Sequence, residues 1–266
     1  MTAQHQLSVE QLSAGYGEKN ILDSINLDIE PGKITSIIGA NACGKSTLLR
    51  TMSRLMNPSS GRVLLDAHPI HNMPTKDLAQ TLGLLPQTPI SPEGITVGDL
   101  VSRGRHPYHK LLSRWSKADD EAIANALEAT KTTELIDREV DELSGGQRQR
   151  VWIAMALAQE TEILLLDEPT TYLDVAHQIE ILDLLVELNQ SRGTTIVLVL
   201  HDLNLAARYS DHLIAMKSGQ VFTHGLPNQV VTEAAIKTVF GLDNQVITDP
   251  ISNTPLVLPI GRYKRT

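Results

Sequence analysis

The chain has 266 residues, of which 41% are hydrophobic and 3% are aromatic, and its formal net charge at pH 7 is −8. This length can bury a full core, and it suits one large α/β domain or a domain with an inserted lobe. The acidic balance gives no general attraction to nucleic acid or anionic lipid, and the few aromatic side chains argue against a stacking platform for single-stranded nucleic acid. We therefore expect no nucleic-acid partner.

The cysteine content and the apolar segments bear on location. A single cysteine, Cys43, excludes an internal disulfide and a cysteine-based metal cage, which fits a reducing compartment. The stretch MTAQHQLSVEQLSAGYG has no apolar region of the kind found in secretion signals. No run approaches the roughly 20 apolar residues that cross a bilayer. These observations predict a cytoplasmic chain that acts at a membrane only through a partner.

The first predicted elements are strands followed by a helix. Residues 1–32 contain short alternating segments, typical of an antiparallel edge sheet. The run KITSIIG at 33–39 is continuously apolar, as expected of a buried parallel strand. The apolar spacing over 46–56 then predicts a helix, which the sequence NPSSG stops. This β-then-α order indicates a doubly wound sheet.

The rest of the chain predicts an inserted lobe and a return to the sheet. Strand patterns disappear between Thr88 and Leu143, so we expect a mostly helical lobe there. EILLLDE at 162–168 and TTIVLVLH at 194–201 predict two more buried strands. The tail after Gly241 is polar and Pro-punctuated, and we expect it to be solvated.

The segment GANACGKST joins the strand at 33–39 to the helix after it, and it satisfies the phosphate-loop pattern G-x-x-x-x-G-K-[ST]. Backbone amides of such a loop wrap phosphates. Lys45 would reach the β- and γ-phosphates, Ser46 would bind Mg²⁺, and Thr47 would contact the α-phosphate. The predicted ATP-binding loop therefore comprises Gly39, Ala40, Asn41, Ala42, Cys43, Gly44, Lys45, Ser46 and Thr47.

Cys43 lies inside this loop and allows two interpretations. It can be a small residue that happens to fit, which we favour for its natural role. Alkylation of the thiol is nevertheless predicted to block nucleotide entry.

Polar residues follow three other apolar strands. In a doubly wound sheet, ligands gather beyond the carboxyl ends of the strands, where Asp167 and Glu168 end one run. Asp167 suits Mg²⁺, and Glu168 suits the group that orients the attacking water. His201 ends another run and could hydrogen-bond a γ-phosphate. Gln87 could reach Mg²⁺ or the water, or it could be an ordinary polar loop residue.

The stretch LSGGQ at 143–147 precedes a predicted helix and also allows two interpretations. Ser144 and Gln147 have the S-x-x-Q spacing of a capping box. The bare amides of a helix N-terminus also attract phosphate, and Gly145 and Gly146 let the backbone approach it closely.

Together these motifs resemble the ATP-binding cassette (ABC) ATPase family over roughly residues 7–240. GANACGKST is similar to its Walker A motif, Gln87 to its Q-loop, LSGGQ to its signature and ILLLDEP to its Walker B motif. TTYLDVAHQ at 170–178 resembles the D-loop region, and His201 the switch histidine. The loop departs from the family at Ala40 and Ala42, where proline and glycine are common, and alanine resists positive φ.

The resemblance implies an α/β P-loop NTPase fold: a core with a parallel sheet flanked by helices, an N-terminal antiparallel β subdomain and an inserted helical subdomain. We assign 1–87 and 144–240 to the core with its β subdomain, 88–143 to the helical subdomain and 241–266 to a C-terminal extension. It implies ATP and Mg²⁺ as cofactors, with Ser46, Gln87 and Asp167 near the metal.

The resemblance also implies a head-to-tail homodimer. The segment Ser144, Gly145, Gly146 and Gln147 of one chain would close on the γ-phosphate that the other chain holds, so it would serve as cap and anion site together. Asp174 would take part in ATP binding. Tyr16 would stack on adenine, although a tyrosine in a polar turn could equally be surface filler.

Within the family, RGRHPYHKLLSRWSKADDEAI at 103–123 and LHDLNLAARYSD at 200–211 resemble the ATPases of ferric-siderophore, haem and vitamin B12 importers, the first segment especially those of the siderophore branch. This implies a peripheral protein at the cytoplasmic face of the membrane. Its partners would be two polytopic permease subunits, docked on the helical subdomain, and indirectly a substrate-binding lipoprotein or periplasmic protein.

Other functions remain as alternatives. The same kind of ATPase subunit could power the import of haem or vitamin B12. A soluble ABC ATPase of DNA repair would carry a long coiled coil before the signature, which is absent from the sequence. A ribosome-acting ABC factor would normally hold two cassettes in one chain.

Overall fold

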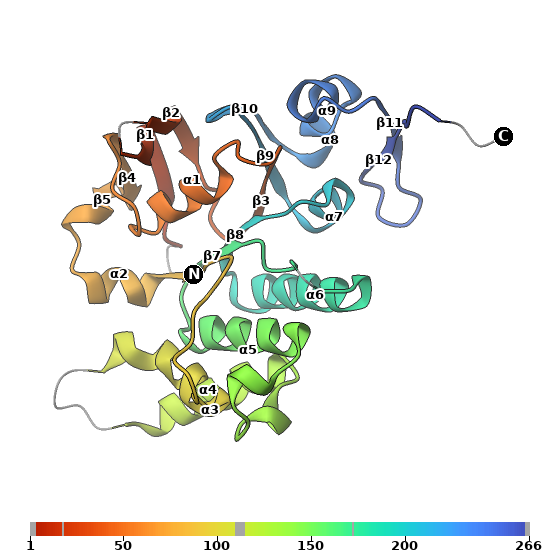
Figure 1. The fold of residues 1–266 in the computed structure, drawn as a ribbon. Helices are drawn as coiled ribbons and strands as arrows, with labels where there is room; N and C mark the ends of the chain where they lie inside the picture. The colour runs from red at the N-terminus through yellow and green to blue at the C-terminus, as the bar shows by residue number, and fades with distance from the viewer. Residues whose placement is uncertain (1–3, 18, 110–114, 172, 264–266) are drawn as a thin grey trace. The chain divides into compact units, whose positions relative to one another are not determined.

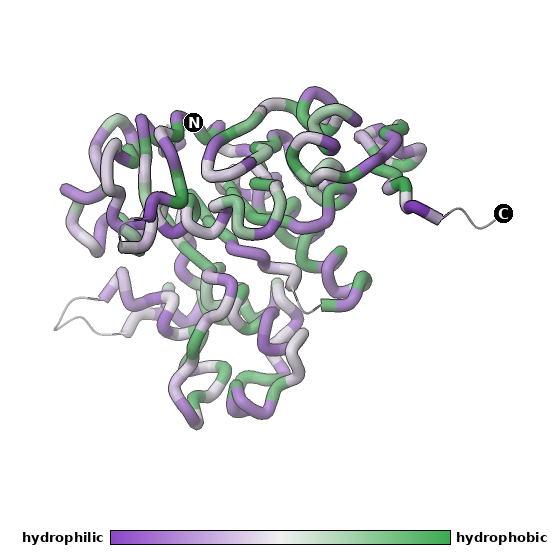
Figure 2. The backbone as a smooth tube through the Cα atoms, turned by 45° about the horizontal axis from the view of Figure 1, so that its top comes forward, coloured by the Kyte–Doolittle hydropathy of each residue, from purple (hydrophilic) through white to green (hydrophobic). Residues whose placement is uncertain are grey.

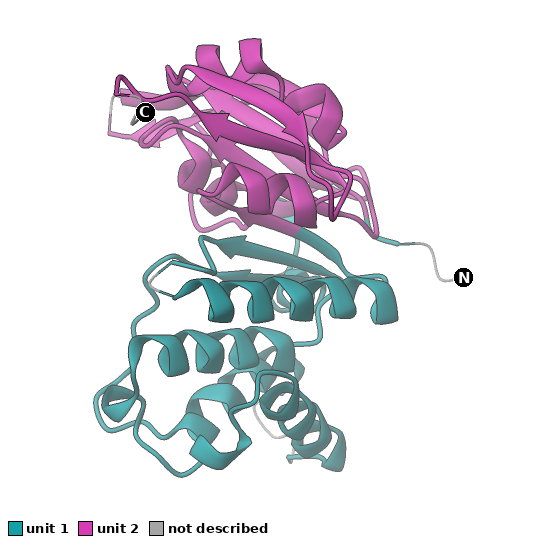
Figure 3. Cartoon of the chain, turned by 90° about the vertical axis from the view of Figure 1, so that its right-hand side faces the viewer, with its two compact units in different colours: residues 1–5, 72–196 teal, residues 6–71, 197–266 magenta. Residues whose placement is uncertain are grey.

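The computed structural model describes residues 4–17, 19–109, 115–171 and 173–263. The chain divides into two compact units, coloured in Figure 3. Unit 1 comprises residues 1–5 and 72–196, and unit 2 comprises residues 6–71 and 197–266. The division differs from the predicted boundaries at 87, 143 and 240, which stay predictions.

Unit 2 contains an antiparallel sheet of four strands in the order β2-β1-β4-β5. The strands are β1 (Leu7–Tyr16), β2 (Lys19–Asp28), β4 (Ser60–Leu65) and β5 (His68–Pro69), and η1 (Ile70–Asn72) follows them (Figure 1). The alternating pattern of residues 1–32 thus marks two strands of this sheet, and β4 pairs with β1 from later in the chain.

Parallel pairing in unit 2 centres on β3 (Ile34–Gly39), all six residues of which are buried. It pairs in parallel with β9 (His212–Lys217), which pairs antiparallel with β10 (Gln220–Gly225). A continuous apolar run suits a strand covered on both faces, as predicted. The helices of this unit are α1 (Lys45–Met52), α7 (Leu203–Tyr209), α8 (Pro227–Val230) and α9 (Glu233–Phe240).

The first helix is shorter than predicted. The apolar spacing predicted helix 46–56, but α1 ends at Met52. Arg54 adopts the left-handed conformation with φ 60°, and the amides of Leu55 and Met56 both bond the carbonyl of Arg50. The apolar Leu55 is consequently 68% exposed. Side-chain spacing could not show this backbone reversal.

Unit 1 contains the parallel pair β6 (Leu82–Leu85) and β7 (Ile163–Asp167), with Leu82 opposite Ile163. All five residues of β7 are buried, as its apolar run predicted. Strand β8 (Thr195–Val199), also buried throughout, is the segment in which the chain passes from unit 1 to unit 2. The longer helices are α2 (Thr75–Thr81), α3 (Val97–Ser102), α4 (Lys117–Ala129), α5 (Gly145–Ala158) and α6 (Val175–Arg192).

The described residues of 88–143 are mainly helical. Besides α3 and α4 they form the short helices η2 (Arg103–Tyr108), η3 (Thr133–Leu135) and η4 (Val140–Glu142). A single isolated bridge joins Thr96 to Glu139 in this described part. The described helices include none with the length and apolar character needed to cross a membrane. Figure 2 shows hydrophobic and hydrophilic residues interspersed along the chain.

The C-terminal segment is folded, contrary to the expected solvated tail. Strands β11 (Asn244–Thr248) and β12 (Pro255–Pro259) form an antiparallel hairpin with Val246 opposite Val257. Val257 is 3% exposed, and β12 packs against α7 (Figure 1). Its alternation is short and flanked by proline, which concealed the strand.

Candidate functional site

The predicted phosphate loop lies between β3 and α1, where the motif required it. Gly39 ends β3, and a Cβ atom there would lie 2.5 Å from the Met216 carbonyl oxygen. Gly44, with φ 109°, precedes α1, and a Cβ atom there would lie 2.8 Å from Leu22 Cδ2. Both positions therefore require glycine, and they fix the two ends of the loop.

Lys45 points back into the loop. Its ammonium group donates hydrogen bonds to the carbonyl oxygens of Gly39 at 2.9 Å and Ala40 at 3.1 Å. The residue is only 5% exposed, so its charge is held at a defined place. Ser46 and Thr47 follow on the first turn of α1, half-buried and buried. Loop amides with a fixed ammonium make a site suited to phosphate.

The departure at Ala42 has a visible backbone consequence. Ala42 adopts φ 60°, in the left-handed region that costs a non-glycine residue about 1–2 kcal/mol. Ala40, Asn41 and Ala42 are all exposed. The loop therefore holds a strained alanine at the position where the resembled family commonly has glycine.

The backbone of Cys43 connects the phosphate loop to a neighbouring turn. Its carbonyl accepts a 2.9 Å hydrogen bond from the amide of Gly219, in the turn between β9 and β10. The residue is 5% exposed. This burial agrees with the interpretation of Cys43 as a small residue that fits the loop.

Tyr16 ends β1, and 53% of it is exposed. Its hydroxyl accepts a 3.2 Å hydrogen bond from Arg50 Nη1 on α1. The contact anchors the hydroxyl end of the ring beside the helix that begins with the phosphate loop. Stacking on adenine stays a prediction.

Unit 1 brings two polar side chains to the carboxylate of Glu168. Gln87 Nε2 donates to Glu168 Oε2 at 2.7 Å, and Thr171 Oγ1 donates to the same oxygen at 3.1 Å. Glu168 is 8% exposed and adopts φ 55°, a strained conformation for a glutamate. Asp167 ends β7 and is 2% exposed. Strained residues with such support are typical of functional sites.

The loop after Glu168 is held by two glutamine side chains that the sequence analysis did not single out. Gln149 on α5 donates to the Pro169 carbonyl at 2.9 Å. Gln178 on α6 donates to the carbonyls of Thr170 and Leu173, at 3.3 and 3.1 Å. These glutamines lie on α5 and α6, and no sequence motif indicated which groups they bind.

The capping box at LSGGQ is confirmed. Ser144 is the N-cap of α5 and its Oγ accepts from the Gln147 amide at 3.3 Å, while Gln147 Oε1 accepts from the Ser144 amide at 3.1 Å. A Cβ atom added at Gly145 would meet nothing within 4 Å, so space lies open beside that glycine. The cap is thus present, and the anion site stays a prediction.

Asp174 caps α6. Its Oδ1 accepts from the His177 amide at 2.9 Å and lies 2.7 Å from His177 Nδ1. These hydrogen bonds, the backbone one first, lower the pKa of Asp174. The structure accounts for Asp174 as a helix cap, and its part in ATP binding stays a prediction.

His201 follows β8 and lies exposed just before Asp202, the N-cap of α7. The predicted site residues divide between the units. Unit 1 holds Gln87, Ser144, Gly145, Gly146, Gln147, Asp167, Glu168 and Asp174; unit 2 holds Tyr16, residues 39–47 and His201.

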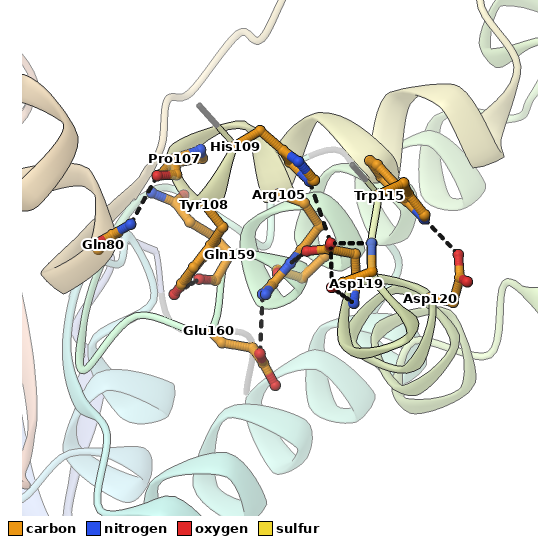
Figure 4. A network of polar contacts seen from close by, with 12 residues as sticks. Gln80, Arg105, Pro107, Tyr108, His109, Trp115, Asp119, Asp120, Gln159 and Glu160 are labelled. Atoms are coloured by element: carbon orange, nitrogen blue, oxygen red, sulfur yellow. Dashed lines mark hydrogen bonds and ion pairs between the residues drawn. The ribbon is translucent and has the colours of Figure 1, made fainter. Parts of the chain in front are cut away.

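The segment RGRHPYH forms a buried polar network around Arg105 (Figure 4). Arg105 is 5% exposed and donates to Asp119 Oδ1 at 2.9 Å, to the Ala158 carbonyl at 2.8 Å and to Glu160 Oε2 at 2.9 Å. Its guanidinium also lies 3.9 Å from the ring centre of Tyr108. The network ties η2 to α4 and to the end of α5, so this segment has a structural role.

Two further contacts, around Trp115, extend the network. The rings of His109 and Trp115 stack with centres 5.0 Å apart, and Trp115 Nε1 donates to Asp120 at 2.6 Å. Burial alone would raise the pKa of Asp119, but hydrogen bonds from Ser116 and Arg105 lower it to about 2. Residues 110–114 of the quoted segment lie outside the described part.

Comparison with known proteins places the chain in a family. The model of the ABC transporter family matches residues 22–171. The chain is 56% identical to a probable siderophore transport system ATP-binding protein of Bacillus subtilis (strain 168), over 96% of this chain and 93% of that protein. It is 52% identical to the ferric enterobactin transport ATP-binding protein of Escherichia coli (strain K12), over 97% of this chain and 95% of that protein.

Solved structures agree. A putative metal-chelate type ABC transporter in an inward-facing conformation matches with a TM-score of 0.82 at 30% identity, over 97% of this chain and 98% of that one. The dimeric structure of a bacterial ABC transporter cassette matches with a TM-score of 0.75 at 29% identity, over 83% and 98%. The chain belongs to the ABC transporter family. Within that family it is an ATPase subunit, and the predicted P-loop NTPase fold is confirmed.

Proposed function

We propose that this chain is the ATP-hydrolysing subunit of an importer for ferric siderophores, peripheral to the cytoplasmic face of the membrane. One observation carries the ATPase chemistry: a phosphate loop with Lys45 fixed at its centre, in a chain that also holds Glu168 in a strained, doubly hydrogen-bonded state. The cargo rests on the 56% and 52% identical relatives, whose names specify siderophore and ferric enterobactin transport.

The site residues suit a nucleotide with Mg²⁺. Asp167, the hydroxyl of Ser46 and the side-chain oxygen of Gln87 would supply the oxygen ligands that this ion prefers, since Mg²⁺ commonly binds through one or two carboxylates together with substrate phosphates. The ion would neutralise charge on the phosphates. Lys45 and the loop amides bind the phosphates, Thr47 contacts the α-phosphate and Tyr16 stacks on the base. His201 hydrogen-bonds the γ-phosphate.

Glu168 orients the water that attacks the γ-phosphate. Hydrogen bonds from Gln87 and Thr171 fix its carboxylate, so little reorganisation is needed when the water is activated. Gln87 also lies at the start of the segment that leads to the helical subdomain. It therefore suits the transmission of the nucleotide state to a membrane partner.

The catalytic assembly is a head-to-tail homodimer. Ser144, Gly145, Gly146 and Gln147 of one chain close on the γ-phosphate bound by the other, and Asp174 lies beside that nucleotide. The open space beside Gly145 supports this arrangement, because a phosphate can approach the backbone there. ATP closes the dimer by binding better to the closed state, and hydrolysis lets it open.

Two polytopic permease subunits dock on the helical subdomain at 88–143, and a substrate-binding lipoprotein or periplasmic protein delivers the cargo to them. The Arg105 network supports a rigid lobe, which such docking requires. Closure of the cassettes then drives the permease between its conformations.

Uptake of labelled iron chelates by cells that lack this chain tests the proposal. We expect loss of uptake for at least one ferric siderophore, restored by the wild-type chain and not by Lys45→Ala. Lys33→Ala, which removes a lysine whose side chain is 45% exposed and which lies outside 88–143, is the charge-matched control and should restore uptake. Normal uptake of every ferric chelate, with a defect for haem or vitamin B12, would assign the other cargo.

A further inference from the structure

The helix after His201 depends on its neighbours for its position. Helix α7 has only seven residues, and helices this short are not stable alone in water. Its inner residues Ala206 and Ala207 are fully buried against β3, but alanine contributes little apolar area. The contacts on its other side therefore matter for where α7 lies.

Those contacts come from the C-terminal hairpin. Asn204 Nδ2 donates to the Val257 carbonyl at 3.3 Å, and Asn204 Oδ1 accepts from the Val257 amide at 2.7 Å. The side-chain amide thus pairs with β12 as a residue of a neighbouring strand would. The Asn204 side chain therefore bonds both the backbone amide and the backbone carbonyl of the buried Val257.

A second contact lies one helical turn further on. Arg208, four residues after Asn204 and on the same face of α7, donates to Asp249 Oδ2 at 2.5 Å. The Asp249 side chain is 6% exposed and also accepts from the amide of Ile251 at 2.9 Å. The Arg208 guanidinium holds the pKa of Asp249 well below its usual range.

The hairpin itself is anchored elsewhere in unit 2. The Val246 amide donates to Glu233 Oε1 at 3.2 Å, and Asn244 Nδ2 donates to the Glu233 carbonyl at 3.2 Å. Lys237, also on α9, forms an ion pair with Asp243. The hairpin is thus a platform fixed to α9, against which α7 is held.

His201 lies in the short segment between β8 and α7, so the position of α7 affects that of His201. Before it, the Leu200 amide bonds the Ile37 carbonyl of β3 at 3.3 Å. After it, Asp202 caps α7 by accepting from the amides of Asn204 and Leu205 at 2.8 and 2.9 Å. His201 therefore lies between Leu200, which bonds β3, and Asp202, which caps α7, and a shift of α7 moves its backbone.

We propose that the C-terminal hairpin is a positioning element for ATP hydrolysis, in which Asn204 and Arg208 hold α7 and thereby aim His201. The inference rests on the proposed function, in which His201 hydrogen-bonds the γ-phosphate. Neither Asn204 nor Arg208 touches the nucleotide. Their loss impairs the chemical step and leaves ground-state nucleotide binding in place.

A double-mutant cycle on the full-length chain tests this, with single-turnover ATP hydrolysis and equilibrium nucleotide binding as readouts. Asn204→Ala and Arg208→Ala should each lower the hydrolysis rate, by roughly tenfold, because small misplacements of a catalytic group can cost up to about 100-fold. The nucleotide Kd should stay unchanged. In a His201→Ala background the same substitutions should have no further effect, because coupled residues are not additive.

Two matched variants separate positioning from general damage. Arg62→Ala removes the exposed ion pair between Arg62 on β4 and Glu10 on β1, which involves neither α7, α9 nor the hairpin, and it should hydrolyse ATP at the wild-type rate. Arg208→Lys keeps a cation for Asp249 and should recover part of the rate. If Arg208→Ala does not fold, the rate of Arg208→Lys still tests the inference.

Additive losses in the His201→Ala background would overturn the inference, as would a rate loss that merely follows a weaker nucleotide Kd. A wild-type chain that hydrolyses no ATP would instead overturn the proposed function. If His201→Ala lowers hydrolysis but Asn204→Ala and Arg208→Ala do not, the positioning inference fails and the proposed function stands. The two failures are therefore distinguishable.

Discussion

Gln87 and Glu168 are 81 positions apart in the sequence, yet the Gln87 amide donates a 2.7 Å hydrogen bond to the Glu168 carboxylate. The same Glu168 oxygen also accepts a hydrogen bond from the Thr171 hydroxyl. Gln87, predicted to reach Mg²⁺ or the water, therefore directly holds the residue predicted to orient the water. A movement of the segment at Gln87 would therefore change the geometry of the Glu168 carboxylate, which we propose orients the water.

Glu168→Gln tests this arrangement. Glutamine keeps the shape of the side chain but lacks the negative charge that orients and activates water, so we expect at least a 100-fold loss of turnover, the lower range for general-base catalysis. ATP binding should persist and the closed dimer should accumulate, measured by nucleotide binding and by size-exclusion chromatography with light scattering.

The control for this variant is Glu187→Gln, at an exposed position of α6. It removes the same charge and should retain wild-type turnover. Turnover near the wild-type rate in Glu168→Gln itself would exclude Glu168 as the water-orienting group.

The strained loop residue predicts a stabilising substitution. Ala42 has φ 60°, so Ala42→Gly relieves a strain of about 1–2 kcal/mol. Glycine also gives the unfolded chain more conformational entropy, which lowers the stability of the folded state by about 0.4–1 kcal/mol. We expect a net gain of roughly 0.5–1 kcal/mol in the free energy of unfolding, measured by urea denaturation without nucleotide.

Ala40→Gly is the matched comparison, because Ala40 lies outside the left-handed region. There glycine brings only the entropic cost, and the free energy of unfolding should fall. If both substitutions change stability in the same direction, the backbone of Ala42 is not strained in solution.

Sequence patterns predicted local features well. The capping box at Ser144 and Gln147 follows from a spacing of three residues, and its two hydrogen bonds lie within one helical turn. The buried strands β3 and β7 follow from uninterrupted apolar runs, since such runs need cover on both faces.

Features that depend on distant contacts or on backbone reversal were not predictable. No local pattern links Gln87 to Glu168, which lies 81 positions away, and no spacing reveals that Arg54 turns left-handed and ends α1 early. The polar composition of the tail concealed a hairpin, because its partners Asn204 and Arg208 lie about 40 to 50 positions upstream.

Cys43 offers a chemical test of the phosphate loop. The chain has one cysteine, and a Cβ atom at Gly39 would lie 2.7 Å from its sulfur. An alkyl group on this buried thiol must therefore displace the loop backbone. We expect slow reaction with a maleimide in the folded state, slower still with ATP present, and loss of ATP binding once modification is complete.

The Cys43→Ala variant controls for reaction elsewhere, since it should hydrolyse ATP and be indifferent to the reagent. Unchanged ATP hydrolysis by the wild-type chain after complete modification, confirmed by mass spectrometry, would refute the prediction.

The Arg105–Asp119 pair predicts how stability depends on pH. The pKa of Asp119 falls from an ordinary 3.8 to about 2 in the folded chain, where hydrogen bonds from Ser116 and Arg105 outweigh its burial. A carboxyl whose pKa is lowered by folding stabilises the protein fully above its unfolded pKa, and this contribution is lost as the pH falls through the folded value. The window for Asp119 is therefore about pH 4 to 2.

Urea denaturation at several pH values checks this. Asp119→Asn should be less stable than wild type at pH 7, and the difference should shrink as the pH falls through that window. Arg105→Ala, which leaves Asp119 buried without its cation, should cost about 3–5 kcal/mol at pH 7. Lys117→Ala, at an exposed ion pair beside the network, should cost less than about 1 kcal/mol and show no such pH dependence. A constant difference between wild type and Asp119→Asn from pH 7 to 2 would show that folding does not lower the pKa of Asp119, since the difference varies with pH only where the folded and unfolded pKa values differ.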